Sequence, residues 1–180
     1  NERALGPEHP QVATSLNNLA WLLQATGDLA GARFLYARAL QINERALGPE
    51  HPQVATSLNK LAELLRATDD LAKARPLYER ALRIRQRALG PEHPLVATSL
   101  NNLAELLQAT GDLTGAGALY ERALRIRQRA LGPEHLDVAK TMENYAALLR
   151  QMQRKSEAVE LETRAKAIRS KHARKFNSTH

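Results

Sequence analysis

Four histidines raise the question of metal chemistry, because they recur at one fixed spacing. Each follows Gly-Pro-Glu, once every 42 residues, at His9, His51, His93 and His135. Metal ligation needs each imidazole nitrogen within about 2 Å of a single ion. Equivalent turns in a stack of helix pairs lie about 20 Å apart, or two helix diameters. One ion cannot bridge them, so we predict no metal site and a turn or helix-capping role for these residues.

No other group of residues supports catalysis. The chain has no cysteine, which excludes thiolate metal sites and disulfides. The glycine-rich segment 111–117 lacks the Lys-Ser/Thr pair of a phosphate loop and falls on a predicted helix. Serines of the Ser15 type are helical and have no histidine near them in the sequence. We predict a protein without enzyme activity and without a cofactor.

The composition predicts one ordinary domain with a core of leucine and alanine. The 180 residues are 43% hydrophobic but only 4% aromatic. No apolar run approaches the roughly 20 residues that span a bilayer, so we expect no membrane association. The lack of cysteine is compatible with a reducing compartment, and we expect a cytoplasmic protein.

An internal repeat organises the chain. Residues 3–17 return unchanged at 45–59 and, with one substitution, at 87–101. A fixed period of this size is typical of stacked helical repeats. We predict repeats at 6–47, 48–89 and 90–131, a divergent capping repeat at 132–173, the end of a preceding repeat helix at 1–5, and a tail at 174–180. The opening residues suggest a piece of a longer protein.

Each repeat is predicted to form two helices. In the first repeat, Leu16, Ala20 and Leu23 recur every three or four residues, which indicates a helical face. Proline opens the first helix, and a Gly-Asp pair ends it and caps the second. We predict an all-α solenoid with first helices at 10–25, 52–67, 94–109 and 136–151, and second helices at 28–47, 70–89, 112–131 and 155–173.

The repeat resembles the tetratricopeptide repeat. The residues that carry this resemblance are Leu16, Leu19, Ala20, Leu23, Gly27, Ala32, Tyr36 and Ala39. The segments "HPQVATSLNNLA" and "LYERALRIRQRALGPEHP" are similar to the repeats of kinesin light chains. The fourth repeat departs from the pattern, with Gln153 in place of the glycine and Glu162 in place of the tyrosine. The resemblance implies a right-handed superhelix with a concave groove that binds short peptides containing an aromatic residue among acidic ones.

Polar residues opposite the packing stripe of the first helices are the candidate binding residues. Asparagine is a poor helix former, yet it recurs in mid-helix, where its amide can hold the backbone of an extended peptide. Alternatively, duplication copied polar residues, some of which bond neighbouring repeats. Trp21 is either an interface anchor or a cover for a preceding repeat. The predicted peptide-binding residues are Asn17, Asn18, Trp21, Asn59, Lys60, Arg66, Asn101, Asn102 and Asn144.

Charge defines two alternative functions. The net charge of +7 is concentrated in residues 150–175, which hold nine basic and three acidic residues. This basic end could bind nucleic acid or an anionic surface, although no aromatic stacking platform accompanies it, so we do not favour nucleic acid. The other alternative is self-association through the N-terminal end. Most second-helix arginines are predicted to be solvated or paired with Glu79 and Glu121, and these are Arg80, Arg83, Arg85, Arg87, Arg122, Arg125, Arg127 and Arg129.

Overall fold

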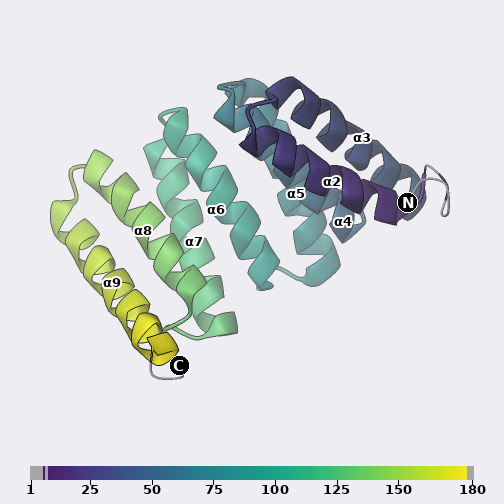
Figure 1. Cartoon of the computed structure of the whole chain (residues 1–180). Coiled ribbons are helices and arrows are strands. Elements are labelled where there is room, and N and C mark those ends of the chain that lie inside the picture. Colours follow the sequence, from purple (N-terminus) through teal and green to yellow (C-terminus); the bar gives the residue numbers. More distant parts are fainter. Residues whose placement is uncertain (1–5, 7, 178–180) are drawn as a thin grey trace. The chain divides into compact units, whose positions relative to one another are not determined.

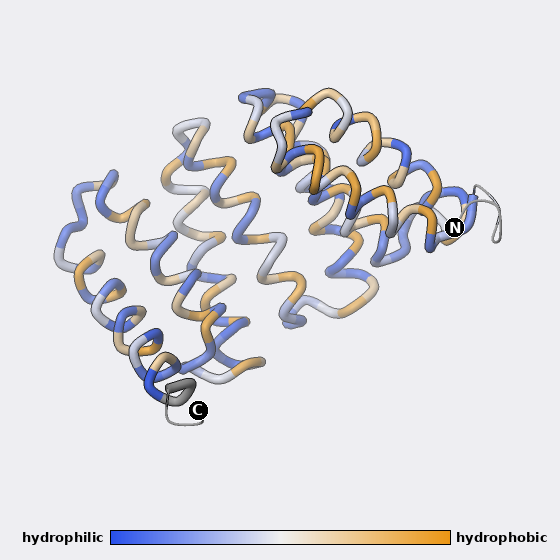
Figure 2. Tube along the Cα trace, in the orientation of Figure 1, coloured by the Kyte–Doolittle hydropathy of each residue, from blue (hydrophilic) through white to orange (hydrophobic). Residues whose placement is uncertain are grey.

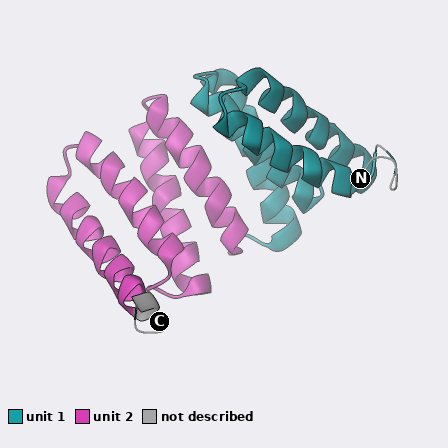
Figure 3. Ribbon diagram, viewed as in Figure 1, with its two compact units in different colours: residues 1–91 teal, residues 92–180 magenta. Residues whose placement is uncertain are grey.

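The computed structural model describes residue 6 and residues 8–177, with side chains up to residue 174. This part of the chain contains eight α-helices and no strand, and Figure 1 shows their order. It divides into two compact units, coloured separately in Figure 3. Unit 1, residues 1–91, contains α2 (Pro10–Ala25), α3 (Leu29–Leu47), α4 (Pro52–Ala67) and α5 (Leu71–Leu89). Unit 2, residues 92–180, contains α6 (Pro94–Ala109), α7 (Leu113–Leu131), α8 (Leu136–Gln151) and α9 (Lys155–Asn177).

The repeated histidines cap the first helix of every repeat. The Nδ1 atom of His9 accepts a hydrogen bond of 3.2 Å from the backbone N–H of Gln11. The same bond, at 3.1–3.2 Å, recurs at His51, His93 and His135. An N-cap side chain satisfies a backbone donor that has no partner inside the helix. The predicted capping role is therefore confirmed.

The turn inside each repeat depends on a residue with positive φ. Gly27 has φ of 90°, and the Asp28 side chain then accepts a bond of 2.9 Å from the N–H of Gly31. The second and fourth repeats place Asp69 (φ 62°) and Gln153 (φ 61°) in the same left-handed conformation. A residue with a Cβ atom is strained there, whereas glycine is not.

Small residues allow the paired helices to approach closely. Ala20 of α2 and Ala32 of α3 are fully buried beside Tyr36, and Leu64 of α4 completes this cluster. In unit 2, Ala104, Ala116 and Tyr120 occupy the corresponding places, with α8 and α9 added to the cluster. Figure 2 shows hydrophobic and hydrophilic stretches alternating along the helices, as one-sided packing requires.

The predicted helices agree closely with the structure. All four first helices have the predicted bounds, and three of the second helices begin one residue later than predicted. The prediction for α9 was too short, because this helix continues to Asn177 and meets no Gly-Pro pair. Lys171 and His172 also fix its last turns to Glu134. The all-α helical-repeat solenoid is confirmed. The prediction for residues 1–5 lies outside the described residues, and the right-handed superhelix stays a prediction.

None of the described helices is long and apolar enough to cross a membrane.

Candidate peptide-binding site

Three of the predicted binding asparagines are buried. Asn17 is only 8% exposed, and Asn59 and Asn101 are more buried still. The prediction that they lie on the open face of their helices is wrong, because a first helix packs on more than its apolar stripe. The Nδ2 atom of Asn17 in α2 donates to the Ser57 hydroxyl of α4 at 3.5 Å. The side chain of Asn59 instead donates to the Ala55 carbonyl of its own helix at 3.0 Å.

In unit 2, the amides of the first helices are bound to the protein's own carboxylate. Asn101 in α6 donates to Glu105 at 2.8 Å, and Asn144 in α8 donates to the same carboxylate oxygen at 2.9 Å. Asn144 also lies 3.3 Å from the side-chain oxygen of Asn101. We call these three residues the closed cluster. Its donors already have an anionic acceptor, so a peptide carbonyl would have to compete with a charge-assisted bond.

The equivalent positions of unit 1 carry different residues and remain open. Two repeat periods before Glu105 and Asn144, the chain has Trp21 and Lys60. Trp21 is 62% exposed, and Lys60 forms no ion pair with any described residue. Together with Asn18 and Leu22 they line an open pocket of about 590 Å³. We call these four residues the open cluster: it combines an aromatic ring, an apolar side chain, an amide and a cation.

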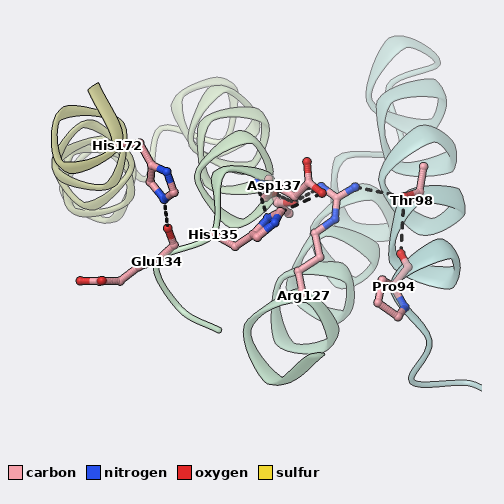
Figure 4. A network of polar contacts seen from close by, with 8 residues as sticks. Pro94, Thr98, Arg127, Glu134, His135, Asp137 and His172 are labelled. Atoms are coloured by element: carbon pink, nitrogen blue, oxygen red, sulfur yellow. Dashed lines mark hydrogen bonds and ion pairs between the residues drawn. The ribbon is translucent and has the colours of Figure 1, made fainter. Parts of the chain in front are cut away.

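Two arginines of the second helices are buried, although the sequence predicted them to be solvated or paired with a nearby glutamate. Arg127 of α7 donates to the Asp137 carbonyl at 3.1 Å and to the hydroxyls of Thr141 (2.5 Å) and Thr98 (3.2 Å). Figure 4 shows the guanidinium between α6 and α8. Arg85 of α5 is buried at the same register and donates to Thr56 at 3.4 Å. The arginine is long enough to reach oxygens of the first helices.

Burial lowers the pKa of the Arg85 and Arg127 guanidinium groups below the ordinary value of arginine. For Arg127, the carboxylates of Asp137 and Glu105 act in the opposite direction and raise the pKa. Glu63 does the same for Arg85. No carboxylate lies within ion-pair distance of Arg127 among the described residues. Its charge is therefore held by neutral oxygens and by more distant acidic groups.

Among the remaining six second-helix arginines, Arg83, Arg87, Arg125 and Arg129 are exposed, as predicted. Four of the six also form ion pairs, three of them with a glutamate other than Glu79 or Glu121. Arg80 binds Glu44 at 2.5 Å. Arg125 is within a turn of Glu121, at 4.0 Å. A recurring exposed pair joins the end of each second helix to the Gly-Pro-Glu-His turn of its own repeat. These pairs are Arg45–Glu8, Arg87–Glu50, Arg129–Glu92 and Lys171–Glu134. Exposed pairs of this kind contribute little to stability.

The basic end of the chain is partly neutralised by ion pairs. Four of the eight basic residues described between 150 and 174 bind a carboxylate. The pairs are Arg150–Glu162, Arg154–Glu157, Arg169–Glu143 and Lys171–Glu134. Binding of nucleic acid or an anionic surface therefore stays a prediction that no specific feature of the structure favours.

The other predicted site residues lie nearer the surface. Asn18 is exposed, whereas Arg66 and Asn102 are half-buried. Within the described residues, no group of three or more histidine, aspartate or glutamate side chains could hold a metal ion. The sequence reasoning missed Asn43, which lies at the register of Arg85 and Arg127 and is buried. The signal that could have identified it is that the other repeats have an arginine at this position.

Comparison with known proteins identifies the class of this protein. The tetratricopeptide repeat family matches the chain at residues 1–45, 23–87, 53–116 and 95–171. No match was found among curated proteins. The chain therefore belongs to the tetratricopeptide repeat family, whose members are generally non-enzymatic interaction scaffolds.

Solved structures narrow the type of repeat. BtubC (BKLC) from P. vanneervenii is 29% identical with a TM-score of 0.81, over 92% of this chain and 66% of that one. A Podosopora anserina putative kinesin light chain with nearly identical TPR-like repeats is also 29% identical, with a TM-score of 0.74, over 94% of this chain and 81% of that one. The apo form of RapI shares 18% identity and a TM-score of 0.77, over 92% of this chain and 58% of that one, which shows the fold alone. The repeats are thus of the kinesin light chain-like type.

Proposed function

We propose that this protein is a scaffold that binds an extended acidic peptide, with an aromatic residue among the acidic ones, on the first helices of unit 1. The observation that carries this proposal is the open cluster, where the exposed ring of Trp21 and the unpaired ammonium of Lys60 line one pocket. The cation attracts a carboxylate, and the tryptophan offers a large apolar anchor of the kind that dominates peptide interfaces. Asn18 can bond the peptide backbone between them.

Unit 2 has a smaller part in this proposal. Glu105 repels an acidic ligand and holds the two amides that would otherwise contact it. The other predicted contacts, in both units, stay predictions, and these are Asn17, Asn59, Arg66, Asn101, Asn102 and Asn144. A non-catalytic role and a cytoplasmic location belong to the same proposal.

Intrinsic fluorescence provides a direct test, because Trp21 is the only tryptophan in the chain. A set of acidic, aromatic-containing peptides is titrated against the protein, and its fluorescence is followed. We expect saturable changes and dissociation constants that weaken with salt, as exposed charge pairs require.

Calorimetry with variants locates the site. Lys60→Asn and Trp21→Glu introduce the residues that unit 2 already carries, so both should fold. We expect each to weaken binding about tenfold or more. Phe34→Ala is the matched control, because Phe34 is similarly exposed, at 66%, but lies on α3 outside the open cluster. Equal binding by Lys60→Asn, Trp21→Glu and the unaltered protein would disprove the proposal.

Self-association is a second candidate function, favoured by an exposed apolar face on α2. Leu19 and Leu22 are 47% and 52% exposed. Their equivalents in α4 are covered: Leu64 belongs to the buried cluster with Ala32 and Tyr36 of α3, and Leu61 packs against that cluster. The face of α2 therefore has the surface chemistry of a helix that another helix covers, and we propose a second copy of the chain as its partner. Sedimentation should show concentration-dependent association that Leu19→Lys abolishes, and a monomer at all concentrations would exclude it.

A further inference from the structure

A second pocket of unit 1 lies beside the open cluster and is lined only by polar side chains. Its volume is about 220 Å³. It shares Asn18 and Lys60 with the open cluster and is otherwise separate. The lining residues are Thr14, Asn17, Asn18, Asn43, Gln53, Thr56 and Lys60.

The same position in unit 2 is occupied by a side chain of the protein itself. Arg127 extends from α7 to three oxygens, the hydroxyl of Thr98 in α6 and the hydroxyl of Thr141 and carbonyl of Asp137 in α8 (Figure 4). Two repeat periods earlier, the corresponding groups are the hydroxyls of Thr14 and Ser57 and the carbonyl of Gln53. The residue that corresponds to the arginine is Asn43.

Asn43 is too short to replace the guanidinium. Its Nδ2 atom donates to the Ser57 hydroxyl at 3.0 Å, and Asn17 donates to the same hydroxyl at 3.5 Å. The Oδ1 atoms of Asn17 and Asn43 are buried and accept no hydrogen bond within the described structure. These side chains are only 8% and 3% exposed. A buried acceptor without a donor is costly, so two such oxygens beside a pocket point to a ligand that carries N–H groups.

We infer that this pocket binds a primary carboxamide, the side-chain amide of a glutamine or asparagine in the bound peptide. The inference rests on the proposed peptide-binding function and adds a specificity to it. The ligand's NH₂ group has two donors, one for each orphan oxygen of Asn17 and Asn43. Both oxygens have almost no accessible surface before the ligand binds, so binding includes a rotation of the two side-chain amides toward the pocket that they line. The ligand's carbonyl oxygen is the acceptor that the Lys60 ammonium lacks.

Other side chains fit this pocket less well. A carboxylate has no N–H for the two orphan oxygens. A guanidinium supplies donors but meets Lys60, and the pocket lining holds no carboxylate to balance two cations. Unit 2 differs on this point, because the carboxylates of Asp137 and Glu105 partly offset the lowering of the Arg127 pKa by burial. An apolar side chain leaves the two orphan oxygens and the Lys60 ammonium without partners.

Small probes test the pocket without any peptide. Propionamide, propionate and ethylguanidinium are titrated separately, and the side-chain amide resonances of Asn17 and Asn43 are followed by NMR. We expect saturable shifts with propionamide alone. Asn43→Arg should abolish them, because it installs the arginine that Arg85 and Arg127 provide at the same register. If Asn43→Arg loses its helical circular dichroism, Asn43→Leu replaces it in the test. This variant removes one orphan oxygen without adding a charge, and we expect it to abolish the propionamide shifts as well.

A peptide series then connects the pocket to the proposed function. One acidic, aromatic-containing host peptide carries Gln, Ala, Glu or Arg at each position in turn. We expect one position where Gln binds about tenfold more tightly than Ala, and we expect Asn43→Arg to reduce that preference below about twofold. If the peptides bind but no position prefers Gln, the carboxamide pocket is wrong and the groove proposal stands. If propionamide binds while no peptide does, the peptide-binding proposal is wrong and the carboxamide pocket stands. Equal shifts with all three probes would show that the pocket does not select a carboxamide, and would overturn the inference.

Discussion

Asn144 of α8 donates a hydrogen bond of 2.9 Å to the carboxylate of Glu105 in α6. This bond joins the first helices of two successive repeats. Its donor is the Asn144 amide, which was predicted from the sequence to bind a peptide. At the same register in unit 1, Lys60 and Trp21 make no such bond. Three equivalent positions thus form a closed polar cluster in unit 2 and an open one in unit 1, because two of the three residues differ: Trp21 and Lys60 stand in place of Glu105 and Asn144.

Arg127→Ala should destabilise unit 2. The substitution removes a buried guanidinium that bonds Thr98, Thr141 and the Asp137 carbonyl. Hydrogen bonds to charged groups contribute about 1.5–3 kcal/mol each when isolated and are not additive, so we expect a total loss of about 3 kcal/mol. Urea unfolding followed by circular dichroism measures it. Arg125→Ala is the exposed control and should stay within about 0.5 kcal/mol of the unaltered protein. A loss at Arg127 no larger than the control's would contradict the bridging role.

The helices could be predicted because every repeat is punctuated in the same way. Pro10 and its equivalents begin the first helices of three repeats, and the φ of 90° at Gly27 ends the first of them. The inward orientation of Asn17 could not be predicted from one helical wheel. A wheel identifies the apolar stripe, but Asn17 is buried by a polar contact with Ser57 of the next repeat. Contacts between repeats depend on spacing in three dimensions.

The candidate site was predicted only in part. Trp21 and Lys60 were named from the sequence and do line one pocket. The burial of Arg127 was missed, because its neighbours on α7 carry the same residue type and nothing local separates them. Its partners Thr98 and Thr141 lie far from it in the sequence, on two different helices. The pocket beside Asn43 exists because an asparagine stands where the later repeats have Arg85 and Arg127. It could not be predicted, because the sequence does not show that this position points inward between two first helices.

Acidification should loosen α9 before it affects the rest of unit 2. Hydrogen bonds from Arg169, Arg154 and Arg150 lower the pKa of Glu143, Glu157 and Glu162, respectively, from the ordinary value of 4.5. A carboxylate with a lowered pKa in the folded state stabilises the fold above its unfolded pKa. That contribution is lost as the pH falls below about 4.5 and through the lowered values.

The expected loss is modest because these pairs are exposed. Thermal unfolding followed by circular dichroism, from about pH 6 to about pH 3, should show a falling midpoint. Arg169→Gln should reduce that slope by freeing Glu143. Arg164→Gln is the control, since Arg164 has no partner among the described residues. A slope that Arg169→Gln leaves unchanged would assign the acid sensitivity to other groups.

Gln153→Gly should stabilise the turn between α8 and α9. Gln153 has φ of 61°, which costs a residue with a Cβ atom about 1–2 kcal/mol. Glycine removes that strain but makes the unfolded chain more flexible, so we expect a net gain of about 0.5–1 kcal/mol. The urea midpoint should rise. Gly111→Ala, at the same turn of the preceding repeat with φ of 87°, should lower it. Opposite signs at the two positions confirm the argument, and a lower midpoint for Gln153→Gly would refute it.

Exchanging the residues of the open and closed clusters should move the binding site. Glu105→Trp with Asn144→Lys gives unit 2 the tryptophan and lysine of unit 1 and removes the carboxylate that repels acidic peptides. We expect calorimetry with a peptide that binds the unaltered protein to change from one site to two per chain.

The reverse exchange, Trp21→Glu with Lys60→Asn, should weaken binding about thirtyfold or more, since it removes an aromatic anchor and the cation together. Arg127 still occupies the position of Asn43 in unit 2. The new site should therefore bind Gln-containing and Ala-containing peptides equally, while the original site prefers Gln. A grafted chain that folds but keeps a single site would show that Trp21 and Lys60 are insufficient, and that the peptide depends on groups of unit 1 that unit 2 lacks.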